Sequence, residues 1–230
     1  MFPSAAEEVV ALFGDNGAGK STLLRCLQGL NRIDAGRLII DGRSTTLSSI
    51  RDAQMHGVEC VHQDLALAPD LSVVDNMFLG KERLYDGFRG GLGALDRKTM
   101  GERTAQALKE LSIALPSLTV PVRDLSGGQR QAVAVARAVM WARTAVLMDE
   151  PTAALGARQS QIVCDLMRTV AARGLGVLVV SHDLPRVLAV ADRVVILWRG
   201  NTAIDTEASK LTVPEAVAIM VGYRQAGEAA

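Results

Sequence analysis

The 230-residue sequence has few aromatic residues, no net charge and no long hydrophobic segment. Aromatic residues make up 3% of the chain, and 25 acidic side chains balance 25 basic ones. A neutral chain lacks the excess of basic charge that is typical of proteins that bind nucleic acid or anionic lipid, so we predict no nucleic-acid partner. The longest uncharged segment, residues 111–122, contains two prolines. A membrane-spanning helix needs about 20 apolar residues, so we expect no such helix.

The N-terminal segment and the cysteines give no indication of export. Residues 1–10 carry two glutamates where a secretory signal has basic residues, and no apolar run precedes them. Cys26, Cys60 and Cys164 show no metal-ligand spacing, which is typical of reduced thiols in a cytosolic protein, and we expect them to serve packing. The hydrophobic content of 49% excludes a disordered chain and is enough for one sizeable core.

Six short apolar runs bounded by turn residues predict buried strands. These runs are residues 9–13, 37–40, 58–61, 145–148, 177–180 and 193–198. Helix-length stretches separate several of them, at residues 21–30, 128–143, 157–173 and 184–191. Because strands and helices alternate, we predict an α/β fold with a largely parallel sheet covered by helices.

The middle of the chain has a different pattern. It shows helical periodicity, notably at residues 96–112, and no strand signal, which predicts a helical insert within the α/β core. A glycine-rich stretch at residues 87–93 predicts a flexible connection inside this insert. Within a single domain, the predicted boundaries are about 1–63 and 144–211 for the core, about 64–143 for the helical subdomain, and 212–222 for a short C-terminal helix.

The first predicted strand runs directly into GDNGAGKST, which matches the phosphate-loop pattern G-x-x-x-x-G-K-[ST] at every fixed position. Its glycines allow backbone N–H groups to point at phosphate oxygens, at the positive end of the following helix. Lys20 would place a charge over the β- and γ-phosphates, and Ser21 offers a hydroxyl to a magnesium ion. The predicted nucleotide-binding residues are Gly14, Asp15, Asn16, Gly17, Ala18, Gly19, Lys20, Ser21 and Thr22. The alternative is an ordinary glycine-rich turn between a strand and a helix.

Two adjacent carboxylates, Asp149 and Glu150, directly follow the predicted strand at residues 145–148. The carboxyl ends of parallel strands form the binding crevice of an open α/β sheet, which would allow Asp149 to hold magnesium. Side chains alternate along an extended segment, so Glu150 points elsewhere and could face a water in line with the γ-phosphate as general base. The alternative is that both carboxylates cap the next helix.

A third motif lies between these two. Leu125, Ser126, Gly127, Gly128 and Gln129 spell LSGGQ, directly before a helical stretch. With the phosphate loop and the Asp149–Glu150 strand, in this order, the chain resembles the ATPases of ABC transporters. The resemblance implies a phosphate-loop, RecA-like core with an inserted helical subdomain, and ATP and Mg²⁺ as cofactors. It also implies that this signature faces the ATP of the opposite subunit in a head-to-tail dimer. Taken alone, Ser126 could be an ordinary helix cap.

The resemblance assigns two further residues. Gln63 follows the predicted strand at 58–61 and is similar to the family's glutamine that reaches the magnesium ion and the attacking water. His182 follows the strand at 177–180 and is similar to the switch histidine that contacts the γ-phosphate and orients Glu150. From the residues alone, Gln63 could equally be a surface residue. The resemblance therefore implies Glu150, His182, Gln63 and Lys20 as catalytic residues, and Ser21, Gln63 and Asp149 as magnesium ligands.

Longer stretches indicate a subfamily. Residues 61–80, 124–143, 148–156 and 191–200 resemble the ATP-binding subunits of bacterial importers of simple sugars such as ribose, xylose or fructose. This resemblance implies transmembrane permease subunits and a second ATPase subunit, in a homodimer, as partners. It implies indirect cooperation with a periplasmic or extracellular sugar-binding protein, and a place at the cytoplasmic face of the membrane.

The sequence departs from the family pattern in two places. Family members carry antiparallel strands and an adenine-stacking aromatic residue before the phosphate loop, but Gly14 comes too early for both, and we do not assign stacking to Phe2. We therefore expect a reduced N-terminal antiparallel β portion, from a displaced start or a truncated copy. Gly156 stands where most members have an aspartate, which we interpret as a subfamily feature. The alternatives to a sugar importer are a catalytically silent, truncated cassette and a soluble ABC ATPase outside transport.

Overall fold

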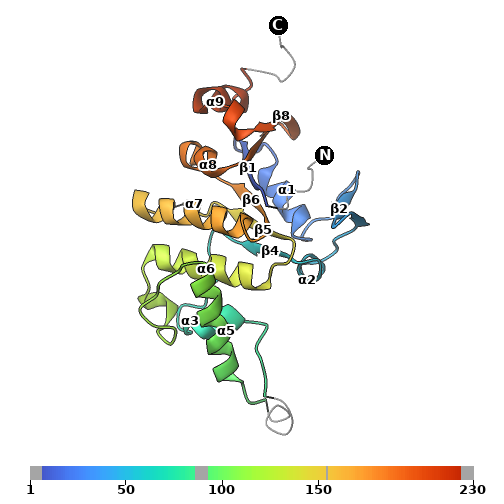
Figure 1. Cartoon of the computed structure of the whole chain (residues 1–230). Coiled ribbons are helices and arrows are strands. Elements are labelled where there is room, and N and C mark those ends of the chain that lie inside the picture. The colour runs from blue at the N-terminus through green and yellow to red at the C-terminus, as the bar shows by residue number, and fades with distance from the viewer. Residues whose placement is uncertain (1–6, 86–92, 154, 224–230) are drawn as a thin grey trace. The chain divides into compact units, whose positions relative to one another are not determined.

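The computed structural model describes residues 7–85, 93–153 and 155–223 (Figure 1). These residues form two compact units, one from the residues up to Gln63 and from Trp141 onward, the other from Asp64 to Met140. Phe2, and the predicted glycine-rich connection except for Gly93, lie outside the described residues.

A six-stranded sheet is the centre of the larger unit, with the strand order β4-β5-β6-β1-β7-β8. Its strands are β1 (Val9–Gly14), β4 (Val58–Val61), β5 (Ala145–Asp149), β6 (Gly176–Val180), β7 (Arg193–Trp198) and β8 (Asn201–Glu207). All neighbours pair in parallel except β7 and β8, which are antiparallel. The largely parallel sheet is confirmed, and every predicted strand except residues 37–40 belongs to it.

The predicted strand at residues 37–40 forms, but the expectation that it joins the parallel sheet is wrong. It is β2 (Leu38–Ile40), which pairs antiparallel with β3 (Arg43–Thr45) in a separate two-stranded sheet. The two strands are joined by Asp41 and Gly42, whose φ angles are 50° and 74°. An Asp-Gly pair with two positive φ angles is the favoured turn of a tight hairpin, and this local turn decides the partner of β2.

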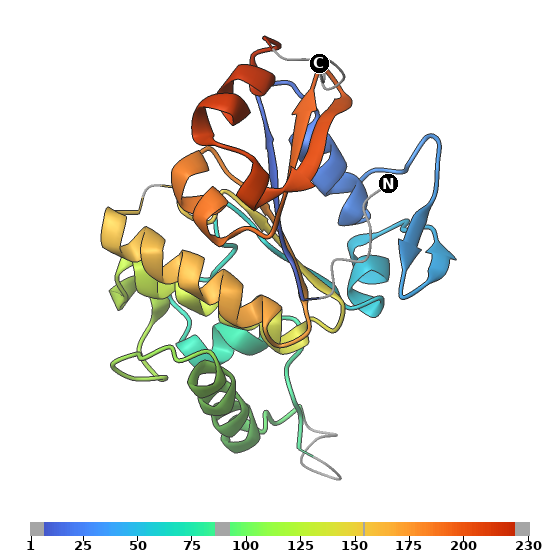
Figure 2. The same ribbon diagram turned by 45° about the horizontal axis from the view of Figure 1, so that its top comes forward.

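Helices cover both faces of the main sheet (Figures 1 and 2). Helices α7 (Ala157–Ala171) and α8 (Leu184–Val190) lie on one face, and α1 (Lys20–Leu27) and α2 (Ile50–Met55) lie on the other. Strand β1 is buried along its whole length because both faces are covered, which explains its continuous apolar sequence. Helix α9 (Val213–Met220) packs on β7 and β8 and begins with a capping box between Thr212 and Glu215.

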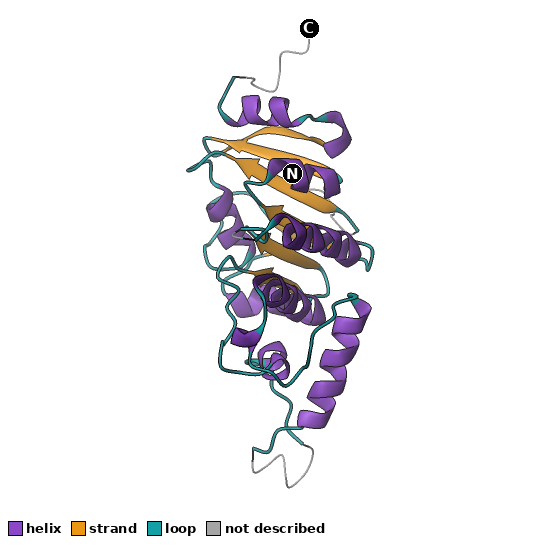
Figure 3. Cartoon of the chain, turned by 90° about the vertical axis from the view of Figure 1, so that its left-hand side faces the viewer, coloured by secondary structure: helices purple, strands orange, loops and turns teal. Residues whose placement is uncertain are grey.

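The smaller unit is helical, as its sequence pattern predicts. Its helices are α3 (Val73–Phe78), α5 (Arg97–Glu110) and α6 (Gly127–Trp141), with a short 3₁₀ turn at Val122–Asp124. Among the described residues, the strands drawn in Figure 3 all belong to the larger unit, and the smaller one consists of helices and loops. Asn76 of α3 is fully buried and organises the chain before it, because its amide donates to the carbonyl oxygens of Ala68, Leu71 and Ser72. Within the described ranges, no helix is long and apolar enough to span a bilayer.

Candidate functional site

The predicted site residues of the larger unit lie at one edge of the main sheet. Strands β4, β5, β6 and β1 are parallel neighbours, so their carboxyl ends meet at the same edge. Gln63 follows β4, Glu150 follows β5, His182 follows β6, and the phosphate loop follows β1. Residues that are far apart in sequence are thus presented side by side, in the order of the strands.

The phosphate loop has the backbone geometry that its glycines permit. Gly17 and Gly19 have φ angles of 78° and 104°, in the left-handed region that glycine adopts without strain. At Gly14 the reason is space, since a Cβ there would lie 2.6 Å from the carbonyl oxygen of Leu197 on β7. The backbone N–H of Gly200 donates to Ala18 O at 3.1 Å, so the turn after β7 supports the loop from outside.

Lys20 lies across the inside of this loop. Its ammonium donates to the carbonyl oxygens of Gly14 and Asp15 at 2.8 and 3.0 Å, and the residue is 7% exposed. Gly19 is the N-cap of α1 and offers no side-chain hydrogen bond, so the first N–H groups of the helix are not capped by a side chain. A buried cation beside the uncapped positive end of an eight-residue helix is an arrangement that suits a phosphate group.

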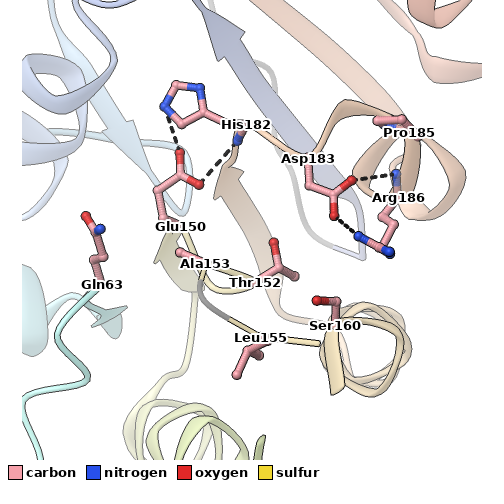
Figure 4. A pocket seen from close by; sticks show the side chains of 10 residues that line it. All are labelled: Gln63, Glu150, Thr152, Ala153, Leu155, Ser160, His182, Asp183, Pro185 and Arg186. Atoms are coloured by element: carbon pink, nitrogen blue, oxygen red, sulfur yellow. Dashed lines mark hydrogen bonds and ion pairs between the residues drawn. The ribbon is translucent and has the colours of Figure 1, made fainter. Parts of the chain in front are cut away.

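Glu150 is held in a strained and specific position after β5. Its φ angle is 49°, unusual for a residue with a side chain, and its N–H donates to Val180 O at 2.9 Å. The N–H of His182 donates to Oε2 at 3.2 Å, and the imidazole Nε2 lies 3.2 Å from Oε1 (Figure 4). Oε1 is buried, and among the described residues no donor forms a well-aligned hydrogen bond with it. The His182 ring is therefore the polar group that an ion-pair contact brings to this oxygen, at 3.2 Å.

The ionisation of Glu150 reflects this environment. Burial raises the pKa of its carboxyl above the ordinary glutamate value, while His182, through its charge and its backbone N–H, acts in the opposite direction. Asp149 raises the pKa of Glu150 further and Lys20 lowers it, so both charges act on the same carboxyl. A partly desolvated carboxylate with a raised pKa is suited to accept a proton.

A pocket of about 570 Å³ opens in front of Glu150 and His182. Figure 4 shows Gln63 on one side of Glu150 and the ion pair of Asp183 with Arg186 on the other. The described residues that line it are Gln63, Glu150, Thr152, Ala153, Leu155, Ser160, His182, Asp183, Pro185 and Arg186.

The lining residues that come from helix starts, Asp183 and Ser160, are not among those predicted from the sequence. Asp183 caps α8 by accepting from the N–H of Arg186, and Ser160 is buried in the first turn of α7. Asp183 is followed by Leu-Pro, which is a helix-start signal, so the sequence could have indicated that residue.

The predicted magnesium ligands come from three different elements. Ser21 is exposed in the first turn of α1, Asp149 ends β5 and is half-buried, and Gln63 is exposed after β4. The part of the chain that the structure describes holds no cluster of three or more His, Cys, Asp or Glu side chains that could bind a metal. A hydroxyl, a carboxylate and an amide oxygen nevertheless fit Mg²⁺, because this ion keeps several waters and shares phosphate oxygens.

The signature belongs to the smaller unit. Ser126 and Gln129 form a reciprocal capping box, in which Ser126 Oγ accepts from the Gln129 N–H at 3.2 Å and Gln129 Oε1 accepts from the Ser126 N–H at 2.9 Å. Leu125 is buried, whereas Ser126 is exposed at the N-terminus of the 15-residue helix α6. Ser126 is therefore a helix cap, as its alternative interpretation predicts, and Gly127 and Gly128 form the first residues of the helix.

Cys60 and Cys164 lie in environments that do not favour a reactive thiolate. Burial raises the pKa of Cys60 to about 12 and that of Cys164 to about 11, so both are thiols at neutral pH. Gln28 donates to Cys60 Sγ at 3.0 Å, and His62 Nδ1 lies 3.8 Å from the same sulfur.

Comparison with known proteins decides the family. The ABC transporter family profile matches residues 2–153. The chain belongs to the ABC transporter family. It is 42% identical to the xylose/arabinose import ATP-binding protein of Sulfolobus acidocaldarius, over 94% of this chain and 84% of that protein. It is 40% identical to the fructose import ATP-binding protein of Rhizobium meliloti, over 95% of this chain and 85% of that protein. With the ribose import ATP-binding protein of Bacillus subtilis it shares 35% identity, but spans only 42% of that protein.

Solved structures agree on the fold. A nucleotide-free ATP-binding cassette from an ABC transporter matches with a TM-score of 0.75 at 23% identity, over 94% of this chain and 89% of that one. A dimeric post-hydrolysis cassette bound to ADP and phosphate matches with a TM-score of 0.71 at 25% identity, over 90% and 88% of the two chains. The predicted fold class and family are therefore confirmed, and the chain is an ABC-type ATPase.

Proposed function

We propose that this ATPase is the energy-coupling subunit of an importer for a simple sugar. The observation that supports this most is the convergence of Gln63, Glu150, His182 and the phosphate loop at one edge of a parallel sheet. The sugar is inferred from the printed names of the relatives, which are xylose/arabinose, fructose and ribose import proteins.

In the proposed reaction, water attacks the γ-phosphate of ATP in line with the bond to the leaving ADP. The new O–P bond forms as the bond between the γ-phosphorus and the β–γ bridging oxygen breaks, and Glu150 takes the proton of the water. Three features suit Glu150 to this role, namely its buried Oε1, its raised pKa and its place beside the pocket. His182 would orient this carboxylate through its N–H and its ring, which lie 3.2 Å from the two carboxylate oxygens.

Lys20 and the uncapped start of α1 would bind the phosphates of ATP. The ammonium would exchange two neutral carbonyl acceptors for charged phosphate oxygens, which are stronger acceptors. Ser21, Asp149 and Gln63 would hold Mg²⁺, which neutralises the charge of the phosphates when it is bound.

The proposed active form is a head-to-tail homodimer at the cytoplasmic face of the membrane, bound to transmembrane permease subunits. A sugar-binding protein outside the membrane would act with it indirectly. In this dimer, residues 125–129 would face the ATP of the other subunit. The capping box supports this proposal because it fixes the start of α6 with Ser126 exposed, at the positive end of a long helix.

The first test is steady-state ATP hydrolysis by the purified chain at saturating MgATP, over a range of protein concentrations. We expect turnover per chain to rise with protein concentration and to vanish in Glu150→Gln. Asp165→Asn is a matched control, because it also neutralises one carboxylate of the larger unit but lies on the exposed side of α7. Turnover no higher than that of Glu150→Gln, from folded protein, would favour the silent cassette and contradict the proposal.

The second test addresses the sugar and the partners. The chain would be reconstituted in proteoliposomes with its permease and binding protein, and uptake of labelled xylose, ribose and fructose would be measured with MgATP on the side of the ATPase. ATP-dependent uptake of one of these sugars supports the importer. ATP hydrolysis that no sugar stimulates, with a chain that does not bind the permease, would favour a soluble ABC ATPase.

A further inference from the structure

The chain directly after Gln63 adopts an unusual backbone conformation. Leu65 and Ala66 are consecutive residues with φ angles of 61° and 44°, both in the left-handed region. Residues other than glycine rarely occupy this region, and each costs about 1–2 kcal/mol relative to the right-handed conformation. Two such residues in succession persist only where surrounding contacts hold them.

Arg137 supplies these contacts from helix α6. Its Nη1 donates to Ala66 O at 2.7 Å and its Nη2 donates to Leu65 O at 2.9 Å, across more than 70 residues of sequence. The left-handed turn points both carbonyl oxygens at the same place, and the planar guanidinium matches such a pair with two parallel N–H groups. Lysine has no equivalent fork, because its ammonium is a single point of attachment.

The rest of this segment is bonded to the chain that leads into the signature. Leu71 O accepts from the N–H of Val122, and Pro69 O accepts from the N–H of Arg123. The N–H groups of Val73 and Val74 donate to the carbonyl oxygens of residues 120 and 118. The first residues of the smaller unit, the approach to the signature and helix α6 therefore form one hydrogen-bonded body.

We propose that Arg137 is a positioning residue that acts through Gln63, by holding Leu65 and Ala66 against the helix that begins with the signature. This inference rests on the proposed ATP hydrolysis, in which Gln63 approaches the magnesium ion and the attacking water. Gln63 is exposed, and the clamp begins two residues after it. Arg137 thus holds the backbone at the second and third residues after Gln63 against the signature helix.

The kinetic test compares Arg137→Gln and Arg137→Lys with Arg97→Gln. The control removes an arginine of the smaller unit that is largely exposed and pairs with Asp75. We expect Arg137→Gln to lower kcat by about ten- to a hundredfold, the scale on which a displaced catalytic group acts, with KM for MgATP nearly unchanged. Arg137→Lys should fall between Arg137→Gln and the wild type. Unchanged kcat in a folded Arg137→Gln variant would overturn the inference.

A double substitution tests whether Arg137 acts through Gln63. If it does, Arg137→Gln should lower kcat no further once Gln63→Ala has already lowered it. Losses that multiply in the double variant, or a Gln63→Ala variant with wild-type kcat, would show that Arg137 does not work through this residue.

Hydrogen exchange separates this inference from the proposed function. In Arg137→Gln, peptides that cover residues 64–70 should exchange at least tenfold faster than in wild type, while peptides from the six-stranded sheet stay unchanged. This measurement needs no ATPase activity. If the wild type does not hydrolyse ATP, the proposed function fails, and unaltered exchange of residues 64–70 in the variant would overturn the clamp independently.

Discussion

Asp192 provides a sharp test of how the larger unit is held together. It lies before β7 and joins three elements, since its Oδ2 accepts from the Val9 N–H at 2.8 Å and its Oδ1 accepts from Arg168 at 2.6 Å. Val9 is fully buried at the start of β1, so Asp192→Ala leaves a buried N–H without its acceptor. An unpaired buried donor costs about 1–3 kcal/mol, and an exposed ion pair contributes about 0–1 kcal/mol. We therefore expect a loss of about 2–3 kcal/mol in the free energy of unfolding.

Arg168→Ala is the matched control for this prediction. It removes the same ion pair, whose side chains are 46% and 36% exposed, but leaves the Val9 N–H bonded to the carboxylate. Thermal unfolding followed by circular dichroism should show Asp192→Ala melting roughly 5–10 °C below wild type, since 1 kcal/mol shifts Tm by about 2–4 °C at this chain length. Arg168→Ala should lose at most about 4 °C. Equal losses in the two variants would refute the role given to the buried N–H.

Three further predictions concern the Glu150 carboxyl, the glycines of the phosphate loop and the buried Asn76. Burial raises the pKa of Glu150, so its protonation stabilises the folded state at low pH, and this contribution is lost as the pH rises through the folded pKa. Glu150→Gln, which mimics the protonated carboxyl, should therefore raise Tm at neutral pH but not below about pH 4. A Tm difference between variant and wild type that does not change with pH would contradict this. Gly14→Ala should clash with β7, and we expect it to weaken MgATP binding at least tenfold in calorimetry and to lower the free energy of unfolding by about 3 kcal/mol. Gly17→Ala is the control, because a Cβ at this position meets open space, and it should lower the free energy of unfolding by only about 1 kcal/mol. Asn76→Ala should lower the free energy of unfolding by about 3 kcal/mol in urea titration, because its amide bonds three carbonyl oxygens, and a loss below 1 kcal/mol would contradict this estimate.

The parallel strands could be predicted because they are buried on both faces and appear as continuous apolar runs, as in β1. Strand β8 was not predicted, because its sequence NTAIDTE is mostly polar. It lies at the edge of the described sheet, where a strand pairs on one side and can face solvent on the other. The hairpin partner of β2 was missed for another reason. A short apolar run does not specify which strand it pairs with, whereas the Asp41–Gly42 turn does, because it brings the next residues back along β2.

The site separates into groups that a sequence can indicate and groups that it cannot. Glu150 and His182 each come two residues after a predicted strand, so topology alone brings them to one edge, and the Ser126–Gln129 capping box joins residues only three positions apart. Arg137 has no such signal, because its partners are backbone carbonyl oxygens, which every residue possesses, more than 70 positions away. The residues that we propose for the chemistry of this ATPase are therefore visible in motifs at strand ends. The bonds that hold the backbone after Gln63 are not visible in this way, because they join a side chain to distant backbone carbonyl oxygens. Substitutions such as Arg137→Gln, which preserve every motif but break such a bond, therefore separate the contribution of the motif residues from that of the bonds that position them.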